Sequence, residues 1–463
     1  MLMHPVITDD PGTKRFVLMI TTGAAFLSPF GISSVNIALP SIGREFLMDA
    51  ILLSWVTTSY LLTSAMFLVP FGKIADIYGR RKIFTYGILL FTLSSLGSAI
   101  STSGTMLIGF RVLQGIGAAA TYCVGAAILT SVFPSGELGK VFGINLAAVY
   151  IGYSVGPFLG GFLTHHLGWR TIFLVNVLLG FIIIFSIFWK LREEWHEARE
   201  ERFDLAGSII YSIALLLIMY GFSQLSTIRG LWFILPGVLA IFAFVKWETK
   251  VENPVLEISL FRNNRVFAFS NLAALINYSA TFAVTFLLSL YLQYIKALTP
   301  ETAGLILLPQ PVTQAFFSPF AGRLSDRIEP RIIASIGMAL TAVGLFLFIF
   351  LGEKTTVAFI VGTLILLGFG FALFSSPNTN AVMSSVENRF YGVASGTIGT
   401  MRMMGMVLSM GITILIFSVY IGKVRMAPEY YPVFLRCTKI AFTFFTVLCI
   451  GGTLASLSRG NVR

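Results

Sequence analysis

Long uncharged apolar runs alternate with short polar segments along this chain, and the alternation predicts its structural elements. Runs without a charged residue cover residues 16–39, 112–133, 266–292 and 355–374. Each run is long enough to cross about 30 Å of hydrocarbon as a helix that rises about 1.5 Å per residue. The pattern therefore predicts an all-α integral membrane protein.

The same pattern, followed along the whole chain, predicts fourteen transmembrane helices. They are expected at residues 16–40, 52–72, 83–101, 105–130, 142–164, 171–191, 206–225, 231–247, 266–292, 302–321, 333–351, 355–379, 391–418 and 435–457. Polar connectors at 190–204 and 246–265 set the seventh and eighth helices apart. We therefore expect a tail (1–15), a six-helix bundle (16–191), a connector with two inserted helices (192–265), and a second six-helix bundle with a short tail (266–463).

An internal repeat supports two related bundles. The stretch PFGKIAD at 70–76 follows the second predicted span of the first bundle, and PFAGRLSD at 319–326 follows the second span of the last bundle. Apart from one inserted alanine, both read Pro-Phe, Gly, a base, an aliphatic residue, a small residue and Asp. Two homologous bundles related by an axis along the membrane normal are a known transporter architecture.

Charge then orients the helices. Charged residues make up only 11% of the chain, against about 25% in a typical soluble domain, and the formal net charge is +11. Most of the 32 Lys and Arg lie in the tails and loops on the same side of the membrane as the N-terminus, and segments rich in basic residues stay cytoplasmic. We expect both termini in the cytoplasm and the protein in the cell membrane. The charge is expected to meet lipid head groups, not nucleic acid.

Five motifs in order carry a family resemblance. They are GKIADIYGRRK (72–82), RVLQGIG (111–117), GYSVGPFLGG (152–161), VNIALP (35–40) and WRTIFLVN (169–176). With these motifs the chain resembles the major facilitator superfamily and, within it, the fourteen-helix drug:proton antiporters. The resemblance implies a secondary transporter that exports amphipathic or drug-like molecules by alternating access and proton exchange, without a cofactor. Expected partners are a small-molecule substrate, membrane lipid and protons, and we expect a monomer.

The charged loop at 72–82 is the expected gate. Glycine permits tight turns, and Asp76 can pair with Arg80 or accept bonds from helix N-terminal amides. The resemblance implies that this loop holds the cytoplasmic ends together and releases them as the bundles rock. The expected gating residues are Gly72, Asp76, Gly79, Arg80 and Arg81, with Asp326 and Arg331 from the second copy. The alternative is a solvated cationic loop that only fixes topology.

Two further sets of residues lie inside the predicted spans or at their very ends, where polar groups are costly and often functional. The set expected in coupling or helix packing is Arg111, Gln114, Gly152, Gly156, Pro157, Gly160 and Gly161. The set expected to line a substrate cavity is Asn36, Asn145, Asn277, Gln293, Gln314, Asn378 and Arg402. For Arg111 the alternative is an interhelical tie to backbone carbonyls. For the amides it is hydrogen bonding between helices.

One absence qualifies the resemblance. No Asp or Glu falls within any predicted span, and the slot where the family usually carries an acid in the first helix reads FGIS (30–33). Such acids neutralise cationic drugs and carry the driving proton. A cavity with arginines and no acid favours a neutral or anionic substrate. The alternative function is therefore a carrier of an anionic or neutral metabolite or lipid-like compound, without carboxylate-based proton coupling.

Two other classes of protein fit the sequence less well. A membrane-embedded enzyme needs clustered His, Asp or Glu, or a nucleophile with a base in reach, and no predicted span offers such a set. No metal-binding or phosphate-binding motif is present either. A receptor ordinarily needs a large loop or tail domain for output, and no predicted loop or tail is that long. The sequence therefore favours a transporter.

Overall fold

The structure is a computed structural model that describes residues 11–191, 194–195, 203–225, 227–251, 254, 258–325, 327–387 and 391–460. Within these ranges the chain is helical, and its one β-bridge joins Asp49 to Arg425. The prediction of an all-α protein is confirmed.

The helices follow the predicted order. The first bundle holds α1 (Pro11–Glu45), α2 (Ala50–Tyr78), α3 (Arg80–Ala99), α4 (Gly104–Val132), α5 (Ser135–His166) and α6 (Arg170–Lys190). The inserted pair is α7 (Leu205–Ser223) and α8 (Leu231–Glu248), with the 3-10 turn η1 (Ile228–Gly230) between them. The second bundle holds α10 (Arg265–Leu290), which continues into the π-helical turn η2 (Tyr291–Ile295), then α11 (Pro300–Leu307), α12 (Pro309–Ser325), α13 (Pro330–Phe348), α14 (Val357–Ser384), α15 (Tyr391–Tyr420) and α16 (Tyr431–Ser458). Short helices α9 (Ile258–Asn263) and η4 (Pro428–Tyr430) lie in connections.

Several spans begin at a side-chain cap. Asp49 accepts from the backbone N–H of Leu52 at the start of α2, and Asn264 accepts from that of Phe267 at the start of α10. Such caps satisfy amide groups of the first turn that have no partner inside the helix. These polar residues therefore fix where the apolar runs become helices.

The predicted span at 302–321 is broken in two. Within the described residues, thirteen helical segments are long and apolar enough to cross a membrane, and the pair α11–α12 supplies the fourteenth crossing. The break falls at Leu308, directly before Pro309, which has no N–H to donate and restricts the residue before it. Two short helices therefore stand where the sequence predicted one.

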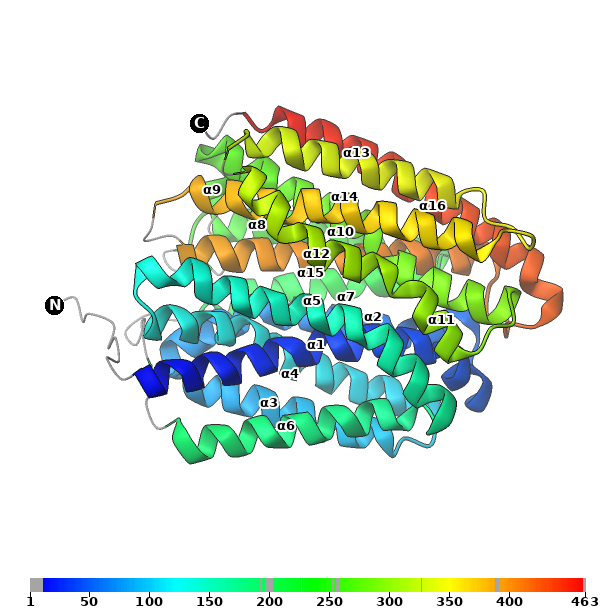
Figure 1. The fold of residues 1–463 in the computed structure, drawn as a ribbon, viewed down its shortest axis with the longest axis horizontal. Coiled ribbons are helices and arrows are strands. Elements are labelled where there is room, and N and C mark those ends of the chain that lie inside the picture. The colour runs from blue at the N-terminus through cyan, green and yellow to red at the C-terminus, as the bar shows by residue number, and fades with distance from the viewer. Residues whose placement is uncertain are drawn as a thin grey trace.

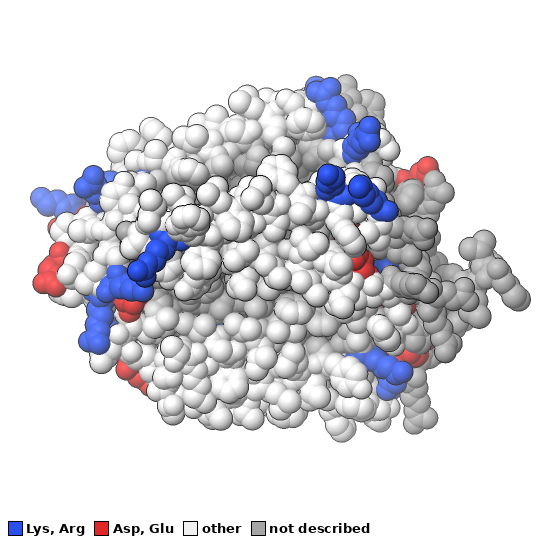
Figure 2. All heavy atoms as spheres, turned by 180° about the vertical axis from the view of Figure 1, so that it is seen from behind, with Lys and Arg blue, Asp and Glu red and all other residues white. Residues whose placement is uncertain are grey.

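Charged side chains gather at the two ends of the molecule and leave a wide uncharged band between them, as the face in Figure 2 shows. This distribution fits a protein whose middle lies in hydrocarbon. Helix α1 begins and α16 ends at the same end, on the left in Figure 1. We call it the terminal end and the opposite one the distal end.

The two bundles lie side by side, the first in the lower and the second in the upper half of Figure 1. In the first, α1 packs on α5, and α4 packs on α2 and α3; in the second, α14 packs on α12 and α13, and α10 on α15. Across the boundary α2 meets α15 and α5 meets α11. Helices α7 and α8 pack on each other, and α7 also contacts α2 and α15. The division of the chain into a tail (1–15), a first bundle (16–191), a connector (192–265) and a second bundle with its tail (266–463) stays a prediction.

Candidate substrate cavity

A cavity of about 140 Å³ lies between the bundles near the middle of their helices. It is bounded by α1, α4, α5, α10, α11, α12, α14 and α15. Its polar lining is Ser28, Ser33, Asn36, Tyr122, Tyr150, Tyr153, Tyr278, Thr281, Thr285, Gln310, Gln314 and Arg402. Both bundles contribute to this lining, so a molecule held here would contact both.

Arg402 is the charged group of the cavity wall. Its Nη2 donates to Thr379 Oγ1 at 2.6 Å, and its guanidinium carbon lies 5.8 Å from the centre of the Tyr278 ring. Its Nε is buried and has no hydrogen-bond partner among the described residues. A buried guanidinium with an unused donor is costly unless a ligand or water supplies an acceptor.

Aromatic rings form much of the remaining wall. Tyr278 makes an edge-on contact with Phe371, their ring centres 5.2 Å apart. The hydroxyl of Tyr150 lies 3.0 Å from Ser375 Oγ in the second bundle, and that of Tyr153 contacts Met406 Sδ at 3.9 Å. Tyrosine combines a flat apolar face with a polar tip, and methionine adapts to irregular shapes. The wall therefore suits a flat amphipathic molecule.

The electrostatic character of the cavity follows from its lining. Among the described residues that line it, Arg402 is charged and none is Asp or Glu. A cation there would meet like charge at low dielectric, where Coulomb interactions are strong. An anion or a neutral molecule rich in acceptors could instead accept hydrogen bonds from the Arg402 guanidinium. The sequence led us to expect arginine and no acid in the cavity, and Arg402 is the arginine that the structure places in its described wall.

The structure brings together three of the seven residues predicted to line the cavity. Asn36, Gln314 and Arg402 are in the wall, whereas Asn145, Asn277, Gln293 and Asn378 are not. Gln293 donates to the carbonyl of Ile37 at 2.8 Å. The placement of these four as cavity residues is corrected, because residues of one span point to different faces of the helix.

The other misplaced amides are buried between helices or half-buried away from the cavity. Asn378 donates to the carbonyl of Ser270 at 3.0 Å and accepts from Arg459 at 2.9 Å. Asn277 is fully buried, and its side chain has no hydrogen-bond partner among the described residues. Asn145 is half-buried on α5. Asn378 therefore bonds one helix to another, which was the alternative role expected for these amides.

Sequence reasoning missed the four cavity tyrosines, Tyr122, Tyr150, Tyr153 and Tyr278. The available signal was their position: each falls well inside a predicted span, away from the interface belts where tyrosine usually gathers. Without the rotation of each helix, that signal cannot separate a cavity wall from ordinary core packing.

Arg111 lies outside the cavity wall. It is fully buried, its Nε donates to the carbonyl of Val56 on α2 at 3.0 Å, and its guanidinium lies over the ring of Tyr60 at 4.2 Å. A second donor bonds Gln114, whose amide donates to Ser95 Oγ at 2.7 Å. The interhelical tie, which the sequence left as an alternative, is therefore present.

A polar contact nevertheless links this network to the cavity. The hydroxyl of Tyr60, beneath the Arg111 guanidinium, lies 2.6 Å from Ser28 Oγ, and Ser28 lines the cavity. Arg111 Nη2 has no hydrogen-bond partner among the described residues. A change in the cavity could therefore reach Arg111 through one shared hydrogen bond.

The glycines of α5 divide between two neighbours. A Cβ on Gly152, Gly156 or Gly160 would lie 2.8, 1.8 or 2.6 Å from atoms of α1, so these three let α5 lie directly against α1. Gly161 faces α11 instead, where a Cβ would lie 2.5 Å from the carbonyl oxygen of Pro300. Pro157 lines the cavity. The motif thus packs within one bundle and across the boundary between the two.

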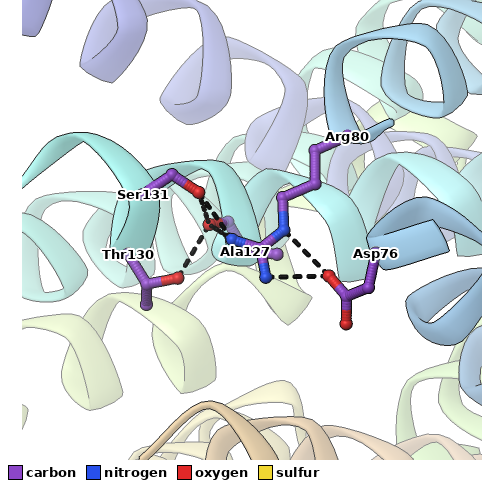
Figure 3. Close-up of polar contacts among 5 residues, drawn as sticks. All are labelled: Asp76, Arg80, Ala127, Thr130 and Ser131. Carbon is purple, nitrogen blue, oxygen red and sulfur yellow. Dashed lines mark hydrogen bonds and ion pairs between the residues drawn. The ribbon is translucent and has the colours of Figure 1, made fainter. Parts of the chain in front are cut away.

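The predicted gate loop contains a well-bonded ion pair. Arg80 Nη2 lies 2.8 Å and its Nε 2.9 Å from Asp76 Oδ1, while Nη1 donates to the carbonyl of Ala127 at 2.9 Å and to Ser131 Oγ (Figure 3). The carbonyl of Ala127 lies in the last turns of α4, where a cation is favourable. Arg80 therefore joins α2, α3 and α4 at the terminal end.

Three of the other predicted gate residues, Gly72, Gly79 and Arg81, lie in the same loop or at its flanking helix ends as this pair. Gly79 has φ +114° between α2 and α3, a conformation that residues with a side chain rarely adopt. Gly72 faces α4, with Cys123 Sγ 3.0 Å from where its Cβ would lie. The backbone N–H of Arg81 donates to Glu194 at 2.8 Å. Arg331 is in the first turn of α13, and Asp326 lies outside the described residues.

The distal end is closed by contacts between the bundles. Ser289 Oγ donates to the carbonyl of Asn36 at 2.7 Å, next to the bond from Gln293 to Ile37. The backbone N–H of Ala50 donates to the carbonyl of Val424 at 3.1 Å. We call these three hydrogen bonds the distal seal.

Two pseudo-symmetric six-helix bundles around a central cavity define a membrane transport protein, not an enzyme. The chain belongs to the Major Facilitator Superfamily, whose family model matches residues 21–410 and, in an overlapping match, residues 270–458. The predicted resemblance to the major facilitator superfamily and the predicted fold are confirmed.

Curated relatives include transport proteins of several bacteria. The chain is 32% identical over 402 residues to the multidrug resistance protein Stp of Mycobacterium tuberculosis, covering 85% of this chain and 74% of Stp. It is 29% identical to the riboflavin transporter RibZ of Clostridioides difficile (84% and 85% covered). It is 30% identical to the cephamycin export protein CmcT of Amycolatopsis lactamdurans (86% and 84% covered).

A solved structure shows the same fold. A bacterial homologue of the human lysosomal transporter Spinster, in an inward-facing and unoccupied conformation, superposes with a TM-score of 0.66 over 97% of both chains at 16% identity. At this identity the likeness concerns the fold alone.

Proposed function

We propose that this protein exports flat, amphipathic, drug-like molecules of neutral or negative charge by alternating access. The observation that carries the proposal is the cavity itself: Arg402 with an unpartnered Nε, framed by tyrosines, with no acid among the described lining residues. A donor-rich aromatic wall binds flat molecules that carry acceptors, and it disfavours cations.

The relatives support this substrate class. Among them are proteins named for multidrug resistance, for export of tetracenomycin C and of cephamycin, and for riboflavin transport. Their names span export and metabolite transport, so the second candidate function, a carrier of an anionic or neutral metabolite, shares the same cavity.

The cavity in this conformation is small for a drug. Its volume of about 140 Å³ is below the roughly 300–1,000 Å³ of typical ligand pockets. Substrate entry therefore requires the bundles to part or the long side chains of Arg402, Met403 and Met406 to turn. Alternating access supplies such a movement.

The proposal also includes the orientation of the protein in the membrane and the energy source for transport. We place both termini in the cytoplasm of a cell membrane, since basic loops stay on that side, and we propose proton exchange as the drive. The lining offers no carboxylate for the proton, so the proton would bind outside the cavity. Asp76 and Glu301, at helix ends, are the candidates. A carrier without proton coupling is the alternative that the same absence favours.

Transport by purified protein in sealed proteoliposomes tests the proposal. Uptake of three flat fluorescent molecules, one anionic, one neutral and one cationic, is compared with and without an imposed pH gradient. We expect the anion or the neutral molecule to move and the cation to lag. Arg402→Gln should reduce anion uptake at least tenfold, the effect of losing about 1.4 kcal/mol of binding.

The matched control is Arg436→Gln, the same change at an exposed arginine of α16, which should leave uptake unchanged. Gradient-driven cation uptake that survives Arg402→Gln would contradict the proposed substrate charge. Anion uptake that ignores the pH gradient and a protonophore would replace proton exchange with the uncoupled carrier.

A further inference from the structure

Three ligand-forming side chains meet at the distal end, away from the cavity. His165 and His166 lie in the last turn of α5, and Glu301 lies in the first turn of α11. His166 Nε2 is 3.1 Å from Glu301 Oε2, and one ligand atom from each of the three residues lies within 4.8 Å of the others. The side chains of His166 and Glu301 are 48% and 33% exposed, so solvent reaches them.

The chemistry of this cluster matches a transition-metal site. Two imidazole nitrogens and one carboxylate oxygen are a ligand set that Zn²⁺ uses, with water in the fourth position. Bonds of about 2.1 Å in a tetrahedron place neighbouring ligand atoms about 3.4 Å apart. His166 and Glu301 already have nearly this separation. Rotation of the exposed His165 ring, whose centre is 4.8 Å from that of His166, would bring in the third ligand.

The cluster also joins the two bundles where their backbones touch. A Cβ on Gly161 of α5 would lie 2.5 Å from the carbonyl oxygen of Pro300, and a Cβ on Gly304 of α11 would overlap the carbonyl of Pro157. These contacts hold the end of α5 and the start of α11 in fixed register. Opening of the distal end would pull the histidines away from Glu301, so the complete ligand set exists only while that end is closed.

We propose that His165, His166 and Glu301 form a site for a divalent transition metal, Zn²⁺ by preference, that ties the bundles together at the distal end. A metal that binds one state only favours that state by a factor of one plus its concentration over its dissociation constant. Zn²⁺ at 100 times its dissociation constant would thus favour the closed distal end about 100-fold. In the proposed orientation this site faces the outside, where it would act as an inhibitory lock.

Metal binding is measured first, on full-length protein in detergent without a polyhistidine tag. Equilibrium dialysis with Zn²⁺ should give one ion per chain at submillimolar concentration, and Co²⁺ should give the visible absorption of a tetrahedral site. His165→Ala, His166→Ala and Glu301→Gln should each weaken binding at least tenfold. The control Glu429→Gln, at another exposed acid of the distal end, should bind as the unaltered protein does.

The lock is then measured without any transported substrate, so that its failure is distinct from failure of the proposed function. Spin labels replace Ile100 and Phe350, which are both 62% exposed at the distal ends of α3 and α13. The distribution of distances between the two labels reports how far the distal ends of the bundles stand apart. Zn²⁺ should remove the long distances from this distribution, and Glu301→Gln should abolish that effect of Zn²⁺. Equal Zn²⁺ binding by all variants, or none by the unaltered protein, overturns the site. Binding without a change in distance overturns the lock.

Discussion

Three buried or cavity-lining arginines show how one residue type can serve three purposes. Arg80 has a carboxylate partner in Asp76, so its charge is neutralised locally. Arg111 has a carbonyl and an aromatic face instead, and its charge stays uncompensated by an acid within the described contacts. Arg402 bonds Thr379 and keeps an unpartnered nitrogen. Arg111 Nη2 is also unpartnered, but only Arg402 of these three lies in the described cavity wall. Arg402 is therefore the incompletely bonded arginine that a ligand in the cavity can reach.

Arg80 should be essential for the stability of the terminal end. Its side chain is 4% exposed and holds α2, α3 and α4 together through Asp76, Ala127 and Ser131. Arg80→Ala should lower the free energy of unfolding by about 3 kcal/mol, the lower end for a broken buried pair because Asp76 is partly exposed. The thermal unfolding midpoint in detergent measures this.

Lys82→Ala is the control for Arg80→Ala, because Lys82 is an exposed base two residues further along α3. This control change should leave the midpoint unaltered. An equal fall in both variants would mean that general loss of positive charge, and not the Arg80 contacts, stabilises the loop.

At the scale of elements, much of the fold could be predicted from the sequence because hydrocarbon forces each apolar run into a helix. The fourteen crossings and their order were predicted in this way. The break at Pro309 was not, although Pro309 and Pro311 were visible, because a proline inside a span can bend a helix without interrupting it. The break brings Leu307, Gln310 and Gln314 to the cavity wall.

The candidate site was less predictable than the fold, for a geometric reason. Asn36 and Gln293 are both amides inside or beside spans, yet the first lines the cavity and the second seals the distal end. Composition marks such residues as costly, but only the rotation of each helix about its axis decides what they face. The cavity tyrosines were missed for the same reason.

The close contact between α1 and α5 depends on a glycine at position 156. A Cβ on Gly156 would lie 1.8 Å from Ser33 Oγ and 3.2 Å from the carbonyl of Phe30, so Gly156→Ala must push the helices apart. Overpacking of this kind costs about 1–3 kcal/mol. We expect a lower thermal midpoint and a smaller monodisperse fraction in gel filtration.

Gly143→Ala is the matched control on the same helix, since nothing lies within 4 Å of the added Cβ. It should leave both measurements unchanged or slightly improved, as alanine favours helix. If Gly143→Ala is as harmful as Gly156→Ala, the close approach of α1 is not what makes Gly156 necessary.

Across the two bundles, the three hydrogen bonds of the distal seal join α1 and α2 of the first bundle to α10 and to the segment between α15 and α16 of the second. Gln293 lies in the π-helical turn that ends α10 and reaches across to the carbonyl of Ile37. Beside it Ser289 donates to the carbonyl of Asn36, a residue that also lines the cavity. The seal and the cavity therefore share α1, and a substrate that moves this part of α1 would disturb both.

Gln293→Ala should therefore shift the molecule toward a state with an open distal end. Loss of one hydrogen bond changes the balance by about 0.5–1.5 kcal/mol, which is up to about tenfold in population. Spin labels at Ile100 and Phe350, in protein whose three native cysteines are replaced, should then show a larger fraction of long distances between the labels.

Gln224→Ala is the control, because it is the same change in the turn after α7 and outside both bundles. Identical distance distributions in all three proteins would mean that apolar packing, and not these hydrogen bonds, keeps the distal end closed. A shift confined to Gln293→Ala would instead show that the π-helical turn of α10 helps to keep the distal end closed.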